Sequence, residues 1–474
     1  MSSAGVGARA QAPGAVRRSP WAVFWVLALI EFMSVMDASV VNIALPHIGE
    51  SLGFTPTTIA WVVDAYLVGF AGFMLLAGRA TDIVGRRRLF IAGVVVFTVF
   101  SLACAASTEP WQLVGSRFFQ GLGAALVTPA ALALITDIFP EGAGRNKAIG
   151  IFSGMAGVAA PVGLVLGGLL TTAAWQWIFL INLPIGLIVL VAALRLLPAS
   201  AGGAAHGLDV PGAVAATGGL VMLILATVRG SAQGWASPLT IIEYALAALL
   251  IVAFVLRQRR AADPLLPTVL FSRRNVVVGN IIFTLVGTVL ISMFFIITLF
   301  LQQVRDFDSL GAALIYLPVP FAMLAGTQVA PRLLRHGPPN VLAGGLLVQA
   351  VALTAWALLI DEQRSIVLAF VVPATVWAFG LGMSIVSSFV VCTMGIDGPI
   401  AGAAAGLATT SYQAGGALGL AVLAVVADSR TRAVADQLGH TEALVAGYTW
   451  ALWGAVVAAV LGMLLTRLIS ARQG

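Results

Sequence analysis

The amino-acid sequence predicts an all-α polytopic membrane protein. Hydrophobic residues make up 60% of the 474 residues and charged residues only 9%, and the mean hydropathy is +1.02. A soluble domain carries about a quarter charged residues, and one aqueous core could not bury so much apolar surface. The chain is also divided into apolar runs of roughly the 20 residues that a helix needs to cross a bilayer. We therefore expect the lipid bilayer to surround most of the protein.

Fourteen apolar runs follow one another along the chain. They lie near residues 21–45, 57–77, 88–106, 110–136, 148–170, 175–197, 210–228, 238–256, 275–301, 309–331, 341–360, 365–391, 399–426 and 444–468. An even number of spans places both ends of the chain on one side of the membrane. Residues 1–20, rich in Gly, Ala and Arg, are expected to form a disordered cytoplasmic tail, and residues 470–474 form the C-terminal tail.

The basic residues predict the orientation. With the N-terminus inside, 19 of the 25 Lys and Arg residues fall on the cytoplasmic side, five fall outside, and Arg117 lies within a span. Because positive charge accumulates in cytoplasmic segments, both termini are predicted to be cytoplasmic. The net charge of +6 therefore reflects topology, and we expect no nucleic-acid partner.

The spacing of the spans predicts two halves and an insert. The longest loops flank the seventh and eighth spans, so residues 198–274 are expected to hold two inserted helices. Residues 21–197 and 275–469 would then form an N-terminal and a C-terminal six-helix bundle. A weak internal repeat supports duplication, because GRRRL at 85–89 is matched by GPPNV 252 residues later, at 337–341. Such halves place a substrate site between them near the membrane midplane.

Ionisable residues within spans are rare and usually face a cavity or a partner. Here they are Glu31, Asp37, Asp64, Arg117 and Glu243. From the helical rise, Asp37, Asp64 and Arg117 lie roughly 10–12 Å below the same outer surface. Asp37 and Arg117 can therefore neutralise each other, or exchange that pairing for a proton on the acid. The alternative is a static ion pair that fixes helix packing.

The remaining acids are expected to differ in role. Glu31 lies nearer the midplane and about 120° around its helix from Asp37, so it should point from another face. Desolvation favours the protonated form of a carboxyl group and a nearby cation favours the ionised form, so such a group can bind and release protons. Asp37, Arg117, Glu31 and Asp64 are the candidates for proton coupling, although a structural or pore-lining role stays open for Glu31 and Asp64. Glu243 is expected at the membrane interface of an auxiliary span.

Enzymatic and metal chemistry are not indicated. Cys104 and Cys392 lie in apolar runs, and the histidines at 47, 206, 336 and 440 lie at loops or span ends. The sequence contains no recognisable metal-binding cluster, nucleophile–base set or phosphate-binding loop. We therefore expect no metal, no cofactor and no enzymatic activity.

A charged motif after the second span resembles the cytoplasmic signature of the major facilitator superfamily. It reads GRATDIVGRRR over residues 78–88. Gly78 and Gly85 would permit a tight turn, Asp82 would meet a helix end or an arginine, and Arg86 and Arg87 would anchor the inner surface. The resemblance implies a role for these five residues in conformational gating.

Further motifs are similar to those of the fourteen-span drug:proton antiporters in that superfamily. They are DASVVNIALP at 37–46, WVVDAY at 61–66, RFFQGLGAA at 117–125, WQWIFLINLP at 175–184 and QAGGALG at 413–419. The resemblance covers about residues 21–469. It implies a major facilitator fold with two extra helices and proton-driven export of drug or antibiotic molecules. It also implies a location in the bacterial cytoplasmic membrane and a monomeric state, with Arg117 acting in proton coupling.

The fifth span bears on the direction of transport. Gly154, Gly157, Pro161 and Gly168 lie on one helical face, whereas Gly163 and Gly167 lie on nearly the opposite one. Small residues let helices approach closely, and proline bends a helix. The pattern resembles the antiporter motif of exporters and implies a gating role, although Gly163 is followed by leucine where the family has proline.

Aromatic and polar residues near the intramembrane acids are expected to line a substrate cavity. They are Met33, Trp61, Tyr66, Phe70 and Gln120 in the first half, and Tyr316, Trp377 and Tyr412 in the second. Aromatic rings suit planar or cationic molecules. Alternatives to multidrug export are a dedicated exporter of a self-made antibiotic or metabolite, and uptake by proton symport.

Overall fold

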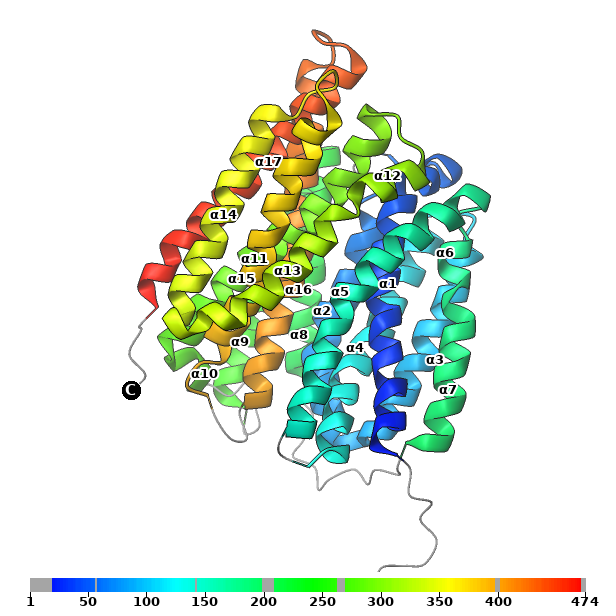
Figure 1. Cartoon of the computed structure of the whole chain (residues 1–474), viewed down its shortest axis with the longest axis vertical. Coiled ribbons are helices and arrows are strands. Elements are labelled where there is room, and N and C mark those ends of the chain that lie inside the picture. The colour runs from blue at the N-terminus through cyan, green and yellow to red at the C-terminus, as the bar shows by residue number, and fades with distance from the viewer. Residues whose placement is uncertain are drawn as a thin grey trace, which may run out of the picture.

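Helices form almost all of the computed structural model, which describes residues 19–55, 58–140, 143–197, 209–261, 269–396 and 401–469 (Figure 1). Their order is α1 Pro20–Leu52, α2 Trp61–Val84, α3 Arg86–Ala105, α4 Pro110–Ile138, α5 Ala143–Ala173, α6 Trp177–Leu180, α7 Asn182–Leu196, α8 Val210–Gln233, α9 Pro238–Arg260, α10 Val269–Ser272, α11 Arg274–Leu299, η1 Phe300–Val304, α12 Ser309–Tyr316, α13 Pro318–Leu333, η2 Leu334–His336, α14 Pro338–Leu359, η3 Val367–Val371, α15 Val372–Thr393, α16 Ala401–Val434, α17 His440–Leu465 and η5 Thr466–Leu468. None of the described residues forms a β-strand.

These helices confirm the predicted all-helical membrane architecture. Within the described ranges, 11 helices are long and apolar enough to cross a bilayer. The helices α2, α5 and α8 contain shorter apolar segments, over Trp61–Met74, Val162–Ala173 and Pro211–Thr227. Over the described residues, each of the predicted apolar runs therefore overlaps one long helix or two helices in direct succession.

Proline explains where several helices begin. Its missing N–H and fixed φ suit the first helical turn, and Pro20, Pro110, Pro238 and Pro338 each open a helix. Pro318 instead marks the junction at which α12 passes into α13. The long apolar stretch 309–333 is consequently two helical segments in place of one straight rod.

The internal repeat has a counterpart in the backbone. Gly85 joins α2 to α3 with φ 100° and ψ 132°, and Gly337 precedes α14 with φ 97° and ψ 122°. Positive φ is the region that glycine adopts without steric cost. Gly78, by contrast, lies within α2, and a Cβ atom there would meet nothing within 4 Å. The prediction that Gly78 contributes to a turn is therefore wrong, because the helix continues to Val84.

The helices pack as two groups joined by a third. Helices α1 to α7 pack against one another, as do α11 and α13 to α17; α12 joins the second group through α13 and packs mainly against α5. We call these groups the first and the second bundle. The helices α8 and α9 pack against each other, and α8 also contacts α2 of the first bundle and α16 of the second.

The bundles meet along α2 and α16, and they also meet at the end of the molecule that carries α12, which lies at the top of Figure 1. There Gln302 donates from Nε2 to the carbonyl oxygen of Ile43 at 2.8 Å. The Ser309 hydroxyl and the Nδ1 atom of His47 lie 3.3 Å apart. Gly168 of α5 packs against the backbone of α12, since a Cβ atom there would lie 2.9 Å from the Cα atom of Leu310. The two bundles are therefore in close contact at this end.

Arginines at the start of α3 bind its neighbours at the other end. Arg86 forms an ion pair with Asp137 of α4 and donates to the Ala133 carbonyl at 3.1 Å. Arg87 donates to the Leu194 carbonyl of α7 at 2.7 Å. The side chain of Asp82 lies outside the part of the structure that is described.

The glycines of α5 divide between two neighbours, as their helical positions predict. A Cβ atom on Gly163 would lie 2.8 Å from the Met36 carbonyl of α1, and one on Gly167 would lie 3.1 Å from the Val40 carbonyl of the same helix. Gly168 faces α12 instead. Residues Gly154, Gly157 and Pro161 are within α5, but their surroundings lie outside the description.

Candidate functional site

A buried ion pair lies at the centre of the first bundle. Asp37 is near the middle of α1, and its Oδ2 atom lies 2.5 Å from the Nη1 atom of Arg117 on α4. The two side chains are 0% and 1% exposed. The predicted pairing of these residues is therefore present, and both side chains are buried away from solvent.

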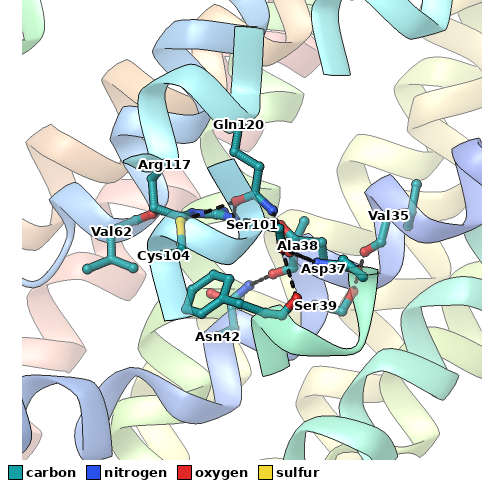
Figure 2. A network of polar contacts seen from close by, with 12 residues as sticks. Val35, Asp37, Ala38, Ser39, Asn42, Val62, Ser101, Cys104, Arg117 and Gln120 are labelled. Carbon is teal, nitrogen blue, oxygen red and sulfur yellow. Dashed lines mark hydrogen bonds and ion pairs between the residues drawn. The ribbon is translucent and has the colours of Figure 1, made fainter. Parts of the chain in front are cut away.

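Polar side chains from three further positions complete the network around Asp37 (Figure 2). Gln120 donates from Nε2 to the Oδ1 atom of Asp37 at 3.0 Å and accepts from Arg117 at 2.6 Å. Asn182, at the start of α7, donates to the same Oδ1 atom at 2.6 Å and to the Ser101 hydroxyl of α3 at 3.0 Å. Four helices of the first bundle thus share one hydrogen-bonded group.

The guanidinium group of Arg117 is held on two more sides. Its Nε atom donates to the Val62 carbonyl of α2 at 3.0 Å. The ring of Tyr66 lies over the guanidinium carbon, with 4.4 Å to the ring centroid, and the ring of Phe179 lies at 5.8 Å. Cation–π contacts are strongest where both partners are desolvated. Arg117 therefore keeps several contacts even when its pairing with Asp37 is exchanged.

The other two intramembrane acids of the first bundle lie apart from this pair. Glu31 is partly exposed and accepts a long hydrogen bond of 3.4 Å from Thr128 of α4. Both acids contact α4, Glu31 at Thr128 and Asp37 at Arg117 and Gln120. Asp64 is fully buried, and neither of its carboxyl oxygens has a hydrogen-bond partner among the described residues.

The residues predicted to line a substrate cavity fall into three groups. Gln120 and Tyr66 belong to the ion network, and Phe70 packs against Tyr66 with 6.1 Å between ring centroids. Met33 is buried in the hydrophobic core of α1, and Trp61 is partly buried at the start of α2.

The third group belongs to the second bundle. Tyr412 packs against Phe283 with 4.8 Å between ring centroids. Tyr316 and Trp377 each pack edge-on against Phe294, at 5.6 and 6.1 Å. The predicted residues are therefore distributed over both bundles.

A cavity of about 770 Å³ lies at the α12 end, between the two bundles. It is lined by residues of α1, α11, η1, α16 and α17 and of adjoining loops, among them Leu45, His47, Glu50, Gln302, Asp428 and Tyr448. None of the eight predicted cavity residues lines it. It is wide enough for a drug-sized molecule, since ligand pockets span about 300–1,000 Å³.

Several residues of the network were missed by sequence reasoning. Asn182 and Ser101 belong to the network around Asp37, and Asp137, outside this network, pairs with the predicted gating residue Arg86. An asparagine between Ile181 and Leu183, within an apolar run, was a usable signal, because a polar amide is costly in hydrocarbon. Ser101 carried no such signal, since serine is common in membrane helices. Within the described ranges, no three His, Cys, Asp or Glu side chains come together in a group that could hold a metal ion.

Comparison with known proteins identifies the family. The sequence pattern of the Major Facilitator Superfamily matches residues 27–420. The puromycin resistance protein pur8 of Streptomyces alboniger is 35% identical over 92% of this chain and 88% of its own. The cephamycin export protein CmcT of Amycolatopsis lactamdurans is 37% identical over 84% of this chain and 83% of its own.

Solved structures agree on the fold. A bacterial homologue of the human lysosomal transporter Spinster aligns with a TM-score of 0.68 and 16% identity, covering 96% of this chain and 98% of the other. A D-xylose–proton symporter aligns with a TM-score of 0.68 and 14% identity, covering 93% and 97%. The chain is therefore a multi-pass protein of the bacterial cytoplasmic membrane and a transporter, not an enzyme. It belongs to the major facilitator superfamily.

Proposed function

We propose that this protein exports drug or antibiotic molecules across the cytoplasmic membrane in exchange for protons. It would cross the membrane fourteen times, with both termini in the cytoplasm, and work as a monomer by alternating access. The observation that carries the proposal is the buried pair of Asp37 and Arg117, because a desolvated carboxyl group with one exchangeable cationic partner suits proton coupling.

The proposed coupling step is an exchange of partners at Asp37. A proton that reaches Asp37 from outside neutralises the carboxylate and releases Arg117. Its contacts with Val62, Tyr66 and Gln120 keep the guanidinium in place meanwhile. Substrate binding would favour the return of the ion pair and release of the proton. Breaking and remaking so buried an interaction can bias two global arrangements, since removal of one partner costs several kcal/mol.

The two bundles are the proposed moving bodies, with 21–197 and 275–469 as their limits and 198–274 as an insert. The contacts of Gln302 with Ile43 and of Ser309 with His47 would close the extracellular side. The proposed gating residues act at both ends. Arg86, Arg87, Gly85 and Asp82 serve the cytoplasmic end, and the small residues of α5 serve the bundle contacts.

Glu31 and Asp64 are proposed as further acidic groups for protons or cationic substrates. An ionised carboxylate without a partner is costly in apolar surroundings. Asp64, which has no partner among the described residues, therefore carries a proton or meets a cation during the cycle. If Asp64→Ala loses transport of dicationic substrates only, this would support a role of Asp64 in binding cationic substrates.

The test is pH-driven transport in inverted membrane vesicles. Asp37→Asn should abolish substrate uptake driven by internal acid while the protein still reaches the membrane. Glu243→Gln is the matched control, since Glu243 pairs with Arg229 at 2.8 Å but lies on the inserted helices. Proton-driven transport at the wild-type rate in Asp37→Asn would refute the coupling mechanism.

A dedicated exporter of one self-made antibiotic is the second candidate, favoured by the names of the two relatives above. A susceptibility panel in an efflux-deficient host separates the two, because a dedicated exporter protects against one compound class only. Proton-symport uptake would instead appear as substrate entry into right-side-out vesicles with the proton gradient.

A further inference from the structure

Five aromatic residues form a contiguous cluster at the centre of the second bundle. Phe294 of α11 contacts Tyr316 of α12 and Trp377 of α15. Trp356 of α14 lies 6.3 Å from Trp377, measured between ring centroids, and 5.6 Å from Phe370 of η3. Phe370 closes the ring of contacts with Tyr316 at 6.4 Å. We call these five residues the aromatic cluster.

Three members of the aromatic cluster carry unused hydrogen-bond donors. Tyr316, Trp356 and Trp377 are each 0% exposed. The Tyr316 hydroxyl and the Nε1 atoms of both tryptophans have no partner among the described residues. Most buried polar groups in proteins are hydrogen-bonded, and each that is not costs about 1–3 kcal/mol. Three such donors in one cluster call for an acceptor that arrives from outside it.

The aromatic cluster reaches the junction of the bundles through α12. Ser309, Ala313 and Tyr316 lie on one face of this helix, by its 3.6-residue period. Gly168 of α5 packs against this face, since a Cβ atom there would lie 3.0 Å from the Ser309 carbonyl and 3.1 Å from the Ala313 Cβ. Tyr316 continues the same face one turn further along. Tyr316 is buried while α5 covers this face, so separation of α5 from α12 during transport would open the aromatic cluster at Tyr316 to a molecule held between the bundles.

The donors also restrict the chemistry of that molecule. An indole N–H can only donate, so the partner must offer acceptor oxygens. The five members of the aromatic cluster bring no charge, so nothing in it compensates an anion. Planar rings favour stacking against planar ligands. Neutral carbonyl or quinone oxygens on a planar aromatic molecule satisfy all three conditions.

We propose that the aromatic cluster is a recognition site for planar aromatic substrates that carry carbonyl oxygens. Tyr316, Trp356 and Trp377 donate to these oxygens, while acids of the first bundle face any cationic group. The proposal rests on the export function above for its biological meaning, but it concerns binding and is tested without a proton gradient.

The experiment measures binding of two planar cations to the purified full-length protein in detergent. Doxorubicin carries quinone oxygens and ethidium carries none. Tyr316→Phe, Trp356→Phe and Trp377→Phe each keep a ring and remove a donor. Each should weaken doxorubicin binding about 3- to 10-fold, as expected for one hydrogen bond, and change ethidium binding less than 2-fold.

Two matched variants control for the loss of a donor elsewhere. Trp175 donates from Nε1 to the Ser51 hydroxyl at 3.1 Å, and Tyr244 shares a hydrogen bond of 3.3 Å with Thr227. Trp175→Phe and Tyr244→Phe should leave doxorubicin binding unchanged. Without ligand, Tyr244→Phe should lower the Tm by roughly 2–4 °C, whereas Tyr316→Phe should leave it unchanged or raise it slightly, because the ring stays and the lost hydroxyl has no partner. The tryptophan variants are compared by ligand binding alone, because each also removes part of a buried ring.

Two results would overturn the proposal. One is a wild-type protein that does not bind doxorubicin, or cluster variants that bind it as tightly as the wild type. The other is a fall in Tm of ligand-free Tyr316→Phe equal to that of Tyr244→Phe, because the Tyr316 hydroxyl would then donate to a ring face inside the fold. Neither result depends on proton coupling, which is tested separately by transport in Asp37→Asn.

Discussion

The two bundles pack alike but hold opposite chemistry at their centres. In the first, α1 and α4 bring together Asp37 and Arg117. In the second, the corresponding helices α11 and α15 contribute Phe294 and Trp377 to the aromatic cluster. The charged groups of the first centre are hydrogen-bonded to neighbouring side chains, whereas three N–H or O–H donors in the second centre have no partner among the described residues. The comparison favours a division of work, with ion exchange in the first bundle and ligand recognition in the second.

The backbone contacts around both centres are nearly the same. A Cβ atom on Gly93 of α3 would lie 2.9 Å from the Gly123 carbonyl of α4. A Cβ atom on Gly345 of α14 would lie 3.0 Å from the Gly380 carbonyl of α15. Close helix pairs of this kind depend on small residues. The scaffold therefore constrains the spacing of the helices and leaves the chemistry of the centre free.

The largest expected effect comes from unbalancing the charged centre. Arg117→Met leaves Asp37 buried without its cation, which should cost about 3–5 kcal/mol of stability and abolish transport. Thermal unfolding of the purified protein measures the loss of stability, and uptake into inverted vesicles measures the loss of transport. The double variant Asp37→Asn with Arg117→Met should recover most of the stability but no transport. A double variant as unstable as Arg117→Met would show that the arginine stabilises the bundle through its other contacts.

The similarity of the two scaffolds predicts equal sensitivity to a single methyl group. Added Cβ atoms would collide with the Tyr66 carbonyl at Gly121 of α4 and with the Met323 carbonyl at Gly382 of α15. Each alanine substitution should cost roughly 1–3 kcal/mol, as overpacking does. Unfolding of both variants in detergent provides the comparison.

Matched controls lie on the same or a neighbouring helix. At Gly115 of α4 and Gly344 of α14, a Cβ atom would meet nothing within 4 Å. Gly115→Ala and Gly344→Ala should leave stability unchanged or raise it slightly, because alanine favours the helix. A large cost at Gly121 with none at Gly382 would show that the two scaffolds differ in tightness.

The smallest effect is expected outside both bundles. The pair of Arg229 and Glu243 joins α8 to α9, with side chains 29% and 13% exposed. A partly exposed pair of this kind contributes little, so Glu243→Gln should cost under about 1 kcal/mol and leave transport intact. Loss of proton-driven transport in this variant would place coupling chemistry on the inserted helices as well.

The sequence was sufficient for the helices and for the ion pair. Apolar runs of spanning length and the matched depths of Asp37 and Arg117 depend on local composition and helical rise, which the chain order alone contains. The surroundings of the pair were not predictable in this way. Gln120 was expected to line a cavity; in the fold its amide also bonds Asp37 of α1 and Ser101 of α3, which lie far from it in the sequence.

The aromatic cluster illustrates the same limit. Tyr316 and Trp377 were singled out by residue type, but Trp356 was not, because residue type alone does not show which aromatic residues meet in the fold. Unused donors are visible only when every neighbour is placed. Gly78 was misjudged for the opposite reason, since a glycine that resembles a turn residue can also lie within an uninterrupted helix.

The position of α8 has a consequence for motion. This helix touches α2 on one side and α16 on the other, and so borders both bodies that must shift. On the α2 side, the Thr217 hydroxyl donates to the Gly72 carbonyl at 2.5 Å. Because this hydrogen bond joins α8 to α2, we expect α8 to move relative to α16 when the bundles shift. The inserted pair would then travel with α2, and lipid would follow the seam that opens and closes along α16.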